Sequence, residues 1–268
     1  KAALEATMLA VNGVAGPDEI FEGQAGWTKL VAGDVDYDGL LAPVGPSFAI
    51  SKVRFKPYAA VGPASAPIAA AVEIFATGRV KPDEIESIIV MLNDHVLEDP
   101  AVDEAKRYPT NRETADHSFH YCTVIALLEG ACGEAQYAPE KLTSPLVREL
   151  LGKVSLVSDP EISALRPRAN GGGVRLTLRD GTIIERRRLY PPGHPKNPLT
   201  DAQIAAKFDE QVVGYLTPAR REAIKAAVFD LENCDNIAEF ARLLKGDWVT
   251  LGHALHLTSA NVVSRFGI

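Results

Sequence analysis

Residues 108–120 bring several groups capable of chemistry into one short stretch of the 268-residue sequence. A phenol, an amide, a carboxylate and two imidazoles are groups that move protons or hold polar substrates in enzymes. They precede or begin a helix predicted at residues 117–131, whose amino-terminal end favours anions. A structural interpretation also fits, because Asp116 can cap this helix while the histidines pack in its first turn. The groups belong to Tyr108, Asn111, Asp116, His117 and His120.

A second charged group lies in the segment SKVRFKPYA, where Val53 and Phe55 alternate with Lys52, Arg54 and Lys56. Alternation at period two predicts a strand with three cations on one face. Such a face would suit a substrate that carries two or three carboxylates. A solvated strand face shows the same pattern, so both interpretations stand.

Other patterns predict no further site. The run Gly171–Gly173 precedes a strand and lacks the Lys-Ser/Thr of a phosphate loop, while Arg186–Arg188 indicates a solvated edge strand. His194 lies in a turn, where it is expected to organise the junction to the next helix. The cysteines lack C-x-x-C spacing and are expected in the core, which predicts no metal site. They are Cys122, Cys132 and Cys234.

Composition narrows the class of protein. Hydrophobic residues make up 46% and charged residues 24% of the chain, which is ordinary for a globular protein. A net charge of −7 without a basic stretch flanked by aromatic residues argues against binding to nucleic acid or to anionic membranes. No apolar run approaches the roughly 18 residues of a membrane span. Unpaired cysteines favour a cytoplasmic location.

The elements that must position these residues follow from periodicity and capping signals. An α+β segment, with a β-α-β unit at residues 51–94, a helix at 117–131 and a hairpin turning at Asp180-Gly181, lies between helical segments. Thr200 and Gln203 form a capping box for a helix to about residue 215, and helices follow at 218–232 and 236–244. We therefore expect a helical domain segment at 1–47, an α+β domain at 48–190, a helical return at 191–245 and an extension at 246–268.

Three motifs occur in an order that resembles the MmgE/PrpD family. KVRFKPYAAVGPASAPIAAAVEI resembles the K-P-Y stretch of that family, and TNRETADHSFHYCTVIALLEG resembles its N-x-E-T-A-x-H-S segment. DGTIIERRRLYPPGHPKNPLTDAQIAAKFDE resembles its D-G…G-H-P-x-N-P…K-F signature. The resemblance implies a large helical domain with a smaller α+β lid, a cleft between them, and commonly a homodimer. It also implies cofactor-free chemistry on small polycarboxylic acids.

The resemblance assigns expected roles to particular residues. Lys56 matches a cationic lysine of the lid, Tyr108 approximately matches an active-site tyrosine, and Asp116 with His117 matches the A-x-H-S element. We expect Lys56, Tyr108 and His117 to take part in catalysis. Substrate contacts are expected from Lys52, Arg54, Asn111 and Asp116.

Two departures from the family pattern qualify these expectations. Residues 59–65 replace polar positions that follow K-P-Y in many relatives, so the substrate can differ from methylcitrate or aconitate. The family's helical domain also begins well before the position matched by Lys1. We therefore expect a metal-independent lyase or isomerase of polycarboxylic acids whose site is completed by a longer chain or a partner chain. The alternative is a non-catalytic or degenerate partner subunit.

Overall fold

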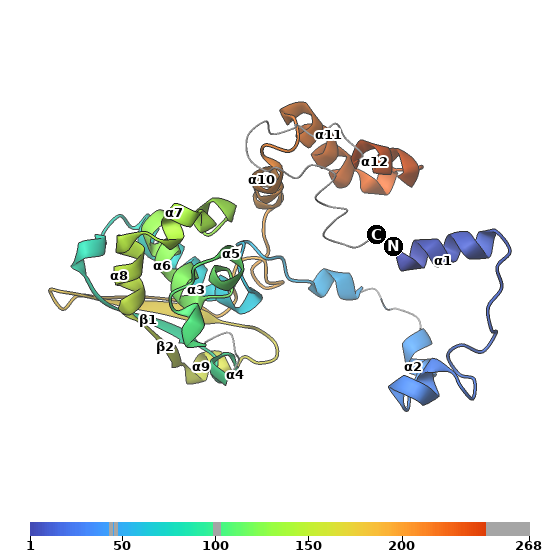
Figure 1. Ribbon diagram of the computed structural model, residues 1–268, viewed down its shortest axis with the longest axis horizontal. Coiled ribbons are helices and arrows are strands. Elements are labelled where there is room, and N and C mark those ends of the chain that lie inside the picture. Colours follow the sequence, from blue (N-terminus) through green and yellow to red (C-terminus); the bar gives the residue numbers. More distant parts are fainter. Residues whose placement is uncertain (43–44, 46–47, 99–102, 245–268) are drawn as a thin grey trace. The chain divides into compact units, whose positions relative to one another are not determined.

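The computed structural model describes the chain except for residues 43–44, 46–47, 99–102 and 245–268. The predicted extension at 246–268 lies outside the described residues. The chain divides into two compact units, Lys1–Ser51 and Lys52–Ile268 (Figure 1). The division into helical and lid domains stays a prediction.

The first unit is helical and buries very little. It contains α1 (Ala2–Val11), a π-helical turn (Thr28–Ala32) and α2 (Tyr37–Leu41). Among its described residues only Gly23 and Gly26 are buried. The apolar side chains of α1 are each more than half exposed; they are Leu4, Met8, Leu9 and Val11. Within this unit, local hydrogen bonds rather than a core hold the helices.

A four-stranded mixed sheet organises the second unit (Figure 1). Its strands are β1 (Ile85–Leu92), β2 (Val154–Ser158), β3 (Gly172–Leu178) and β4 (Ile183–Arg188), in the order β2-β1-β3-β4. β1 is parallel to β2 and antiparallel to β3, and β3 is antiparallel to β4. The β3–β4 hairpin turns at Asp180-Gly181, where Gly181 has a φ of 84°. The predicted hairpin is confirmed.

Helices cover one face of the sheet (Figure 1). α3 (Ser65–Ala76) lies over β3 and β4, while α6 (Phe119–Glu129) packs beside α3 and reaches β1 and β2. The core between them contains fully buried Ile68, Ile88 and Leu176, each contributing about 1.5–3 kcal/mol. Shorter helices complete this part of the unit: α4 (Asp94–Glu98), α5 (Arg112–Ala115), α7 (Pro139–Leu142), α8 (Pro145–Gly152) and α9 (Pro160–Ser163).

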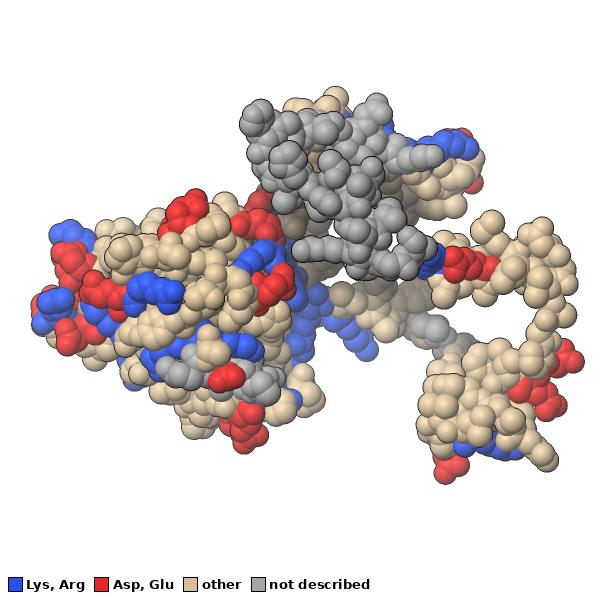
Figure 2. Space-filling model, viewed as in Figure 1, with Lys and Arg blue, Asp and Glu red and all other residues tan. Residues whose placement is uncertain are grey.

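The opposite face of the sheet is polar. The carboxylate of Glu185 accepts from Arg175 at 2.5 Å and from Arg187 at 2.7 Å. Arg187 also pairs with Asp159 at 3.0 Å. Figure 2 shows cations and carboxylates interspersed over the visible surface of this unit. Within the arginine run of this edge strand, Arg187 takes part in these ion pairs, Arg188 pairs with Glu73 of α3, and Arg186 donates to Glu185 O.

Three further helices follow the sheet: α10 (Asp201–Val212), α11 (Pro218–Phe229) and α12 (Ile237–Leu244). The Thr200 side chain accepts from Gln203 N–H, and the Gln203 side chain accepts from Thr200 N–H, so the predicted capping box is confirmed. These three helices contribute one buried residue, Ile224 of α11.

The predicted strand at residues 51–59 is wrong. Ala49–Lys52 form a 3₁₀ turn, and the following residues are irregular. A strand needs a neighbour, and the edges of the sheet are β2 and β4. The N–H of Phe55 instead donates to Gly193 O at 2.9 Å, and Pro57 has no N–H. The β-α-β unit around α3 is therefore wrong too, and Lys52, Arg54 and Lys56 share no strand face. The predicted α+β class is confirmed.

No helix among the described residues has the length and apolar character needed to cross a membrane.

Ser118 caps α6, and we expect its loss to destabilise the fold. Its buried hydroxyl accepts from Tyr121 N–H at 3.0 Å and donates to Lys106 O at 2.5 Å. Ser118→Ala should lower the free energy of unfolding by about 1–3 kcal/mol, because both partners lose a buried bond. Urea denaturation measures the change. Ser144→Ala is the matched control, since Ser144 precedes α8 without a side-chain cap bond. Equal losses in the two variants would contradict the prediction.

Candidate functional site

A cavity of about 250 Å³ brings three of the predicted site residues together: Lys56, Asp116 and His117. It lies in the second unit, between the loop at residues 56–61, helix α5 and helix α10. The remaining lining residues are Tyr58, Ala59, Ala60, Val61, Arg112, Glu134, Lys207 and Gln211.

Backbone hydrogen bonds hold the loop that carries Lys56. Phe55 N–H donates to Gly193 O at 2.9 Å, Ala59 N–H to Cys132 O at 2.9 Å, and Val61 N–H to Asp116 O at 2.8 Å. The G-H-P turn, the end of α6 and the α5–α6 junction thus converge on one short loop. This convergence sets Lys56 beside residues that lie far away in the sequence.

A chain of charged side chains ends at His117. Its Nδ1 is bonded to Asp116 Oδ1 and lies 3.3 Å from Glu113 O. Asp116 Oδ2 also accepts from Arg112 Nη1 at 3.0 Å. Arg112 makes a bidentate pair with Glu134, through Nε at 3.0 Å and Nη2 at 2.5 Å. This bond raises the pKa of the Arg112 guanidinium, so Arg112 remains a cation.

The Asp116 carboxylate can bind His117 and Arg112 because other residues cap the neighbouring helices. Asn111 Oδ1 accepts from Thr114 N–H at 2.9 Å and caps α5, while Ser118 caps α6. The alternative interpretation, in which Asp116 caps the helix, is therefore wrong. Asn111 serves as the cap of α5 and does not line the cavity.

Besides Asn111, three predicted site residues lie outside this cavity. Tyr108 sits beneath the guanidinium of Arg148, 5.7 Å from the ring centre. Arg54 Nη2 donates to Arg168 O at 2.5 Å. Lys52 is exposed and ends the 3₁₀ turn. None of the three is a lining residue.

Several lining residues escaped sequence reasoning. Lys207 of α10 donates from Nζ to the carbonyl of Lys56. Burial, with smaller effects from Cys132 and Glu73, raises the pKa of Tyr58 to about 12, so its hydroxyl stays protonated at neutral pH. The K-P-Y and K-F motifs contain Tyr58 and Lys207, but only folding shows that they meet.

A thiol pair lies behind the loop. The Tyr137 hydroxyl contacts Cys132 Sγ at 3.3 Å and Cys122 Sγ at 3.6 Å, and donates to Ala59 O at 2.6 Å. Both thiols are buried, as predicted, whereas Cys234 is exposed, which contradicts the prediction. A hydrogen bond with Cys132 and burial raise the pKa of Cys122. These thiols therefore support the loop from within the core.

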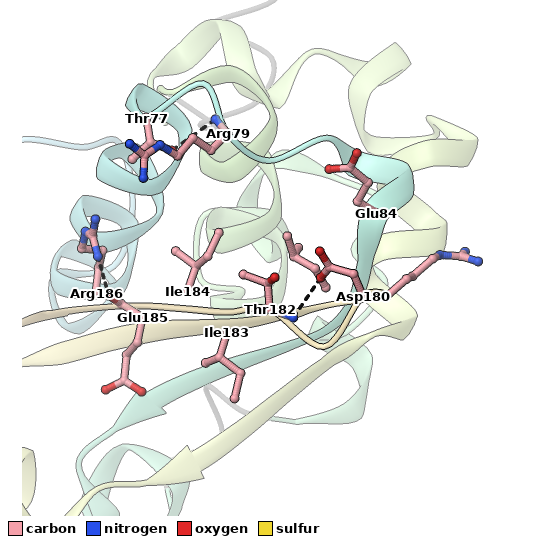
Figure 3. A pocket seen from close by; sticks show the side chains of 11 residues that line it. Thr77, Arg79, Glu84, Asp180, Thr182, Ile183, Ile184, Glu185 and Arg186 are labelled. Carbon is pink, nitrogen blue, oxygen red and sulfur yellow. Dashed lines mark hydrogen bonds between the residues drawn. The ribbon is translucent and has the colours of Figure 1, made fainter.

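A larger hollow, of about 630 Å³, lies by the β3–β4 hairpin. Figure 3 shows Ile184 between Arg186 on one side and Asp180 and Thr182 at the turn. Asp180 Oδ1 accepts from Thr182 N–H at 2.8 Å, so this carboxylate is engaged in the turn. None of the predicted site residues lines this hollow. The smaller cavity holds the imidazole, the carboxylates and the lysines, and we take it as the candidate site.

Among the described residues, no group of three or more His, Cys, Asp or Glu side chains is arranged to hold a metal ion.

Three curated relatives match parts of this chain. Cis-aconitate decarboxylase of Mus musculus is 29% identical over 168 residues, which is 61% of this chain and 32% of that protein. The Homo sapiens enzyme of the same name is 26% identical over 260 residues, 92% of this chain and 51% of that protein. The 2-methylcitrate dehydratase of Cupriavidus necator is 28% identical over 129 residues, 45% of this chain and 26% of that protein. The chain thus spans about half or less of each relative's length.

The sequence profile of the MmgE/PrpD C-terminal domain matches residues 58–233. This stretch includes the sheet, the capped helices and most residues that line the candidate site, and it covers more than half of the chain. The chain belongs to the MmgE/PrpD family.

Proposed function

We propose that this chain provides the lid side of a metal-independent lyase or isomerase that abstracts a proton next to a carboxylate of a small polycarboxylic acid. The observation that supports it is the cavity in which Lys56 and Lys207 lie beside the Asp116–His117 pair. The relatives named above are a decarboxylase and a dehydratase, so loss of carbon dioxide and elimination of water are the first reactions considered. Inversion of a centre is a third reaction, which rests on the family resemblance alone.

The charges in the cavity favour a ligand with more than one carboxylate. Arg112 is neutralised by Glu134 and Asp116, so Lys56 carries the positive charge available to the substrate. Lys207, bonded to the Lys56 carbonyl, adds a second positive charge beside it. Abstraction of a proton beside a carboxylate creates a second negative charge on that carboxylate. A fixed ammonium such as that of Lys56 stabilises this charge as it develops, which lowers the barrier.

His117 is the proton-transfer group that the geometry favours. The bond to Asp116 orients Nδ1, which leaves Nε2 for the substrate proton. Positioned bases of this kind contribute about 10²–10⁴-fold to a rate. Tyr108 stays a candidate proton donor, although it lies outside the cavity with its ring against Arg148. Lys52, Arg54 and Asn111 stay candidate substrate contacts with less support.

A second candidate function is that of a non-catalytic partner subunit. Within the first unit, apolar side chains of α1 are largely exposed; within the second, Ile237 of α12 is 65% exposed. Such surfaces suit another helical chain or a second copy. We propose a homodimer or a partner chain that supplies the rest of the site, acting in the cytoplasm and without nucleic acid or membrane.

Lys56→Met should reduce turnover of the proposed substrate by at least about 100-fold, because the developing charge loses its fixed cation. Proton NMR in D₂O with cis-aconitate, citrate and 2-methylcitrate detects both turnover and deuterium exchange beside the carboxylates. The control is Lys81→Met, a lysine whose side chain is 75% exposed at a surface ion pair. Equal rates in the two variants would contradict the role of Lys56.

The same sample should be weighed by native mass spectrometry. Inert acids together with a single isolated chain would contradict the enzymatic proposal for this chain alone. Inert acids in a complex with a second protein would favour the partner subunit.

His117→Gln should lower kcat by about 10²–10⁴-fold with a much smaller change in KM, because the base is lost while the lysines remain. Asp116→Asn should lower kcat less, since it alters only the orientation of the ring. Steady-state kinetics on the acid that reacts measure both. A His117→Gln variant with a raised KM and an unchanged kcat would assign His117 to substrate binding instead.

A further inference from the structure

We propose that Lys207 is a positioning residue, which fixes the backbone of the loop that carries Lys56 and thereby links helix α10 to the candidate site. This inference rests on the proposed function only for its catalytic consequence. Its structural part concerns the ligand-free chain.

The contact itself joins residues that are 151 positions apart. Lys207 Nζ donates to the carbonyl oxygen of Lys56. A lysine on a solvated helix face would keep its ammonium in water, whereas Lys207 is partly buried against the loop. The carbonyl of Lys56 therefore receives a charge-assisted hydrogen bond, a stronger type than a bond between neutral groups.

Lys207 lies at the centre of a groove along this loop. Three cavities, of about 250, 180 and 290 Å³, are lined by both Tyr58 and Lys207. Their other lining residues come from the loop, α5 and the α5–α6 junction, the residues that follow α6, the segment after β4, and α10. The Lys207 side chain thus bridges the groove between α10 and the loop.

The loop needs an anchor at this point. Phe55 and Ala59 donate backbone bonds to Gly193 and Cys132, but Pro57 between them has no N–H. Among the contacts of the described residues, the bond from Lys207 fixes the backbone at Lys56 itself. Without the bond from Lys207, the backbone between Phe55 and Ala59 has more conformational freedom. The Lys56 ammonium group is then held less firmly as well.

Helix α10 is itself held in place on both sides. One turn after Lys207, Glu210 lies so close to Gly133 that a Cβ there would come within 1.8 Å of its Oε1. On the same helix, Asp209 pairs with Lys225 of α11 at 2.8 Å. Lys207 therefore transmits the position of the α10–α11 pair to the loop.

Hydrogen exchange of the ligand-free full chain, followed by mass spectrometry, tests the structural part. Lys207→Met keeps the apolar stem and removes the donor, and should speed exchange at the Phe55 and Ala59 amides by about fivefold, because their anchors open more often. Lys207→Arg keeps a donor and should restore slow exchange. Lys81→Met, at an exposed ion pair, should leave this loop unchanged.

Gly133→Ala is a second variant that leaves Lys207 in place. The added methyl group meets only the carboxylate end of the flexible Glu210 side chain, so exchange at the two amides should stay slow in this control. Unchanged exchange in Lys207→Met, with normal circular dichroism, would overturn the inference.

Kinetics test the catalytic consequence separately. Lys207→Met should lower kcat more than it raises KM, since Lys56 is misplaced in the transition state. A raised KM with unchanged loop exchange would make Lys207 a direct substrate ligand and overturn the positioning role. If the chain is inert towards every acid, the proposed function fails, while the exchange data still decide the inference.

Discussion

Asp116 holds the candidate site together, because its backbone and its side chain bind different segments. Its carbonyl accepts from Val61 N–H at 2.8 Å, which fixes the carboxyl-terminal end of the loop at residues 56–61 that carries Lys56. Its carboxylate binds Arg112 through one oxygen and His117 through the other, and 14% of the side chain is exposed. A carboxylate this far from water needs such partners, since an unpaired buried charge is costly. Fixing these partners also orients the imidazole.

The packing beneath the loop explains why this arrangement is rigid. α3 contains a run of buried residues from Ser65 to Ala71, most of them small, which lets the helix approach the sheet closely. Gly172 of β3 lies so near that a Cβ would be 2.6 Å from Pro67 Cδ. The loop leads directly into this helix through the 3₁₀ turn at Gly62–Ala64. Its carboxyl-terminal end is therefore as firmly placed as the core.

Its other end depends on polar contacts instead. At its amino-terminal end, the loop is fixed by Gly193 O and by Lys207, both of which come from the segment after the sheet. Hydrogen bonds of this kind contribute modestly and open more easily than a packed core. One end of the loop is thus fixed by core packing, while the other is held by hydrogen bonds that can open. This combination suits a reaction in which a substrate must enter, lose a proton and leave.

Local signals in the sequence predicted several secondary-structure elements and three residues of the candidate site. Period-two alternation and Asp180-Gly181 predicted the hairpin, and Thr200 with Gln203 predicted the start of α10. The family motifs predicted that Lys56, Asp116 and His117 belong to the functional site. These features depend on neighbours a few residues apart, so the sequence carries them directly. The strand at 51–59 failed for the same reason, because alternation cannot say whether a pairing partner exists.

Tertiary structure alone decided which of these residues meet. It placed Tyr108 against Arg148, outside the cavity. It also brought Lys207 to the carbonyl of Lys56 across 151 positions. Such contacts arise when separate elements are packed on one sheet, and no periodicity or spacing within a segment encodes a distance between segments.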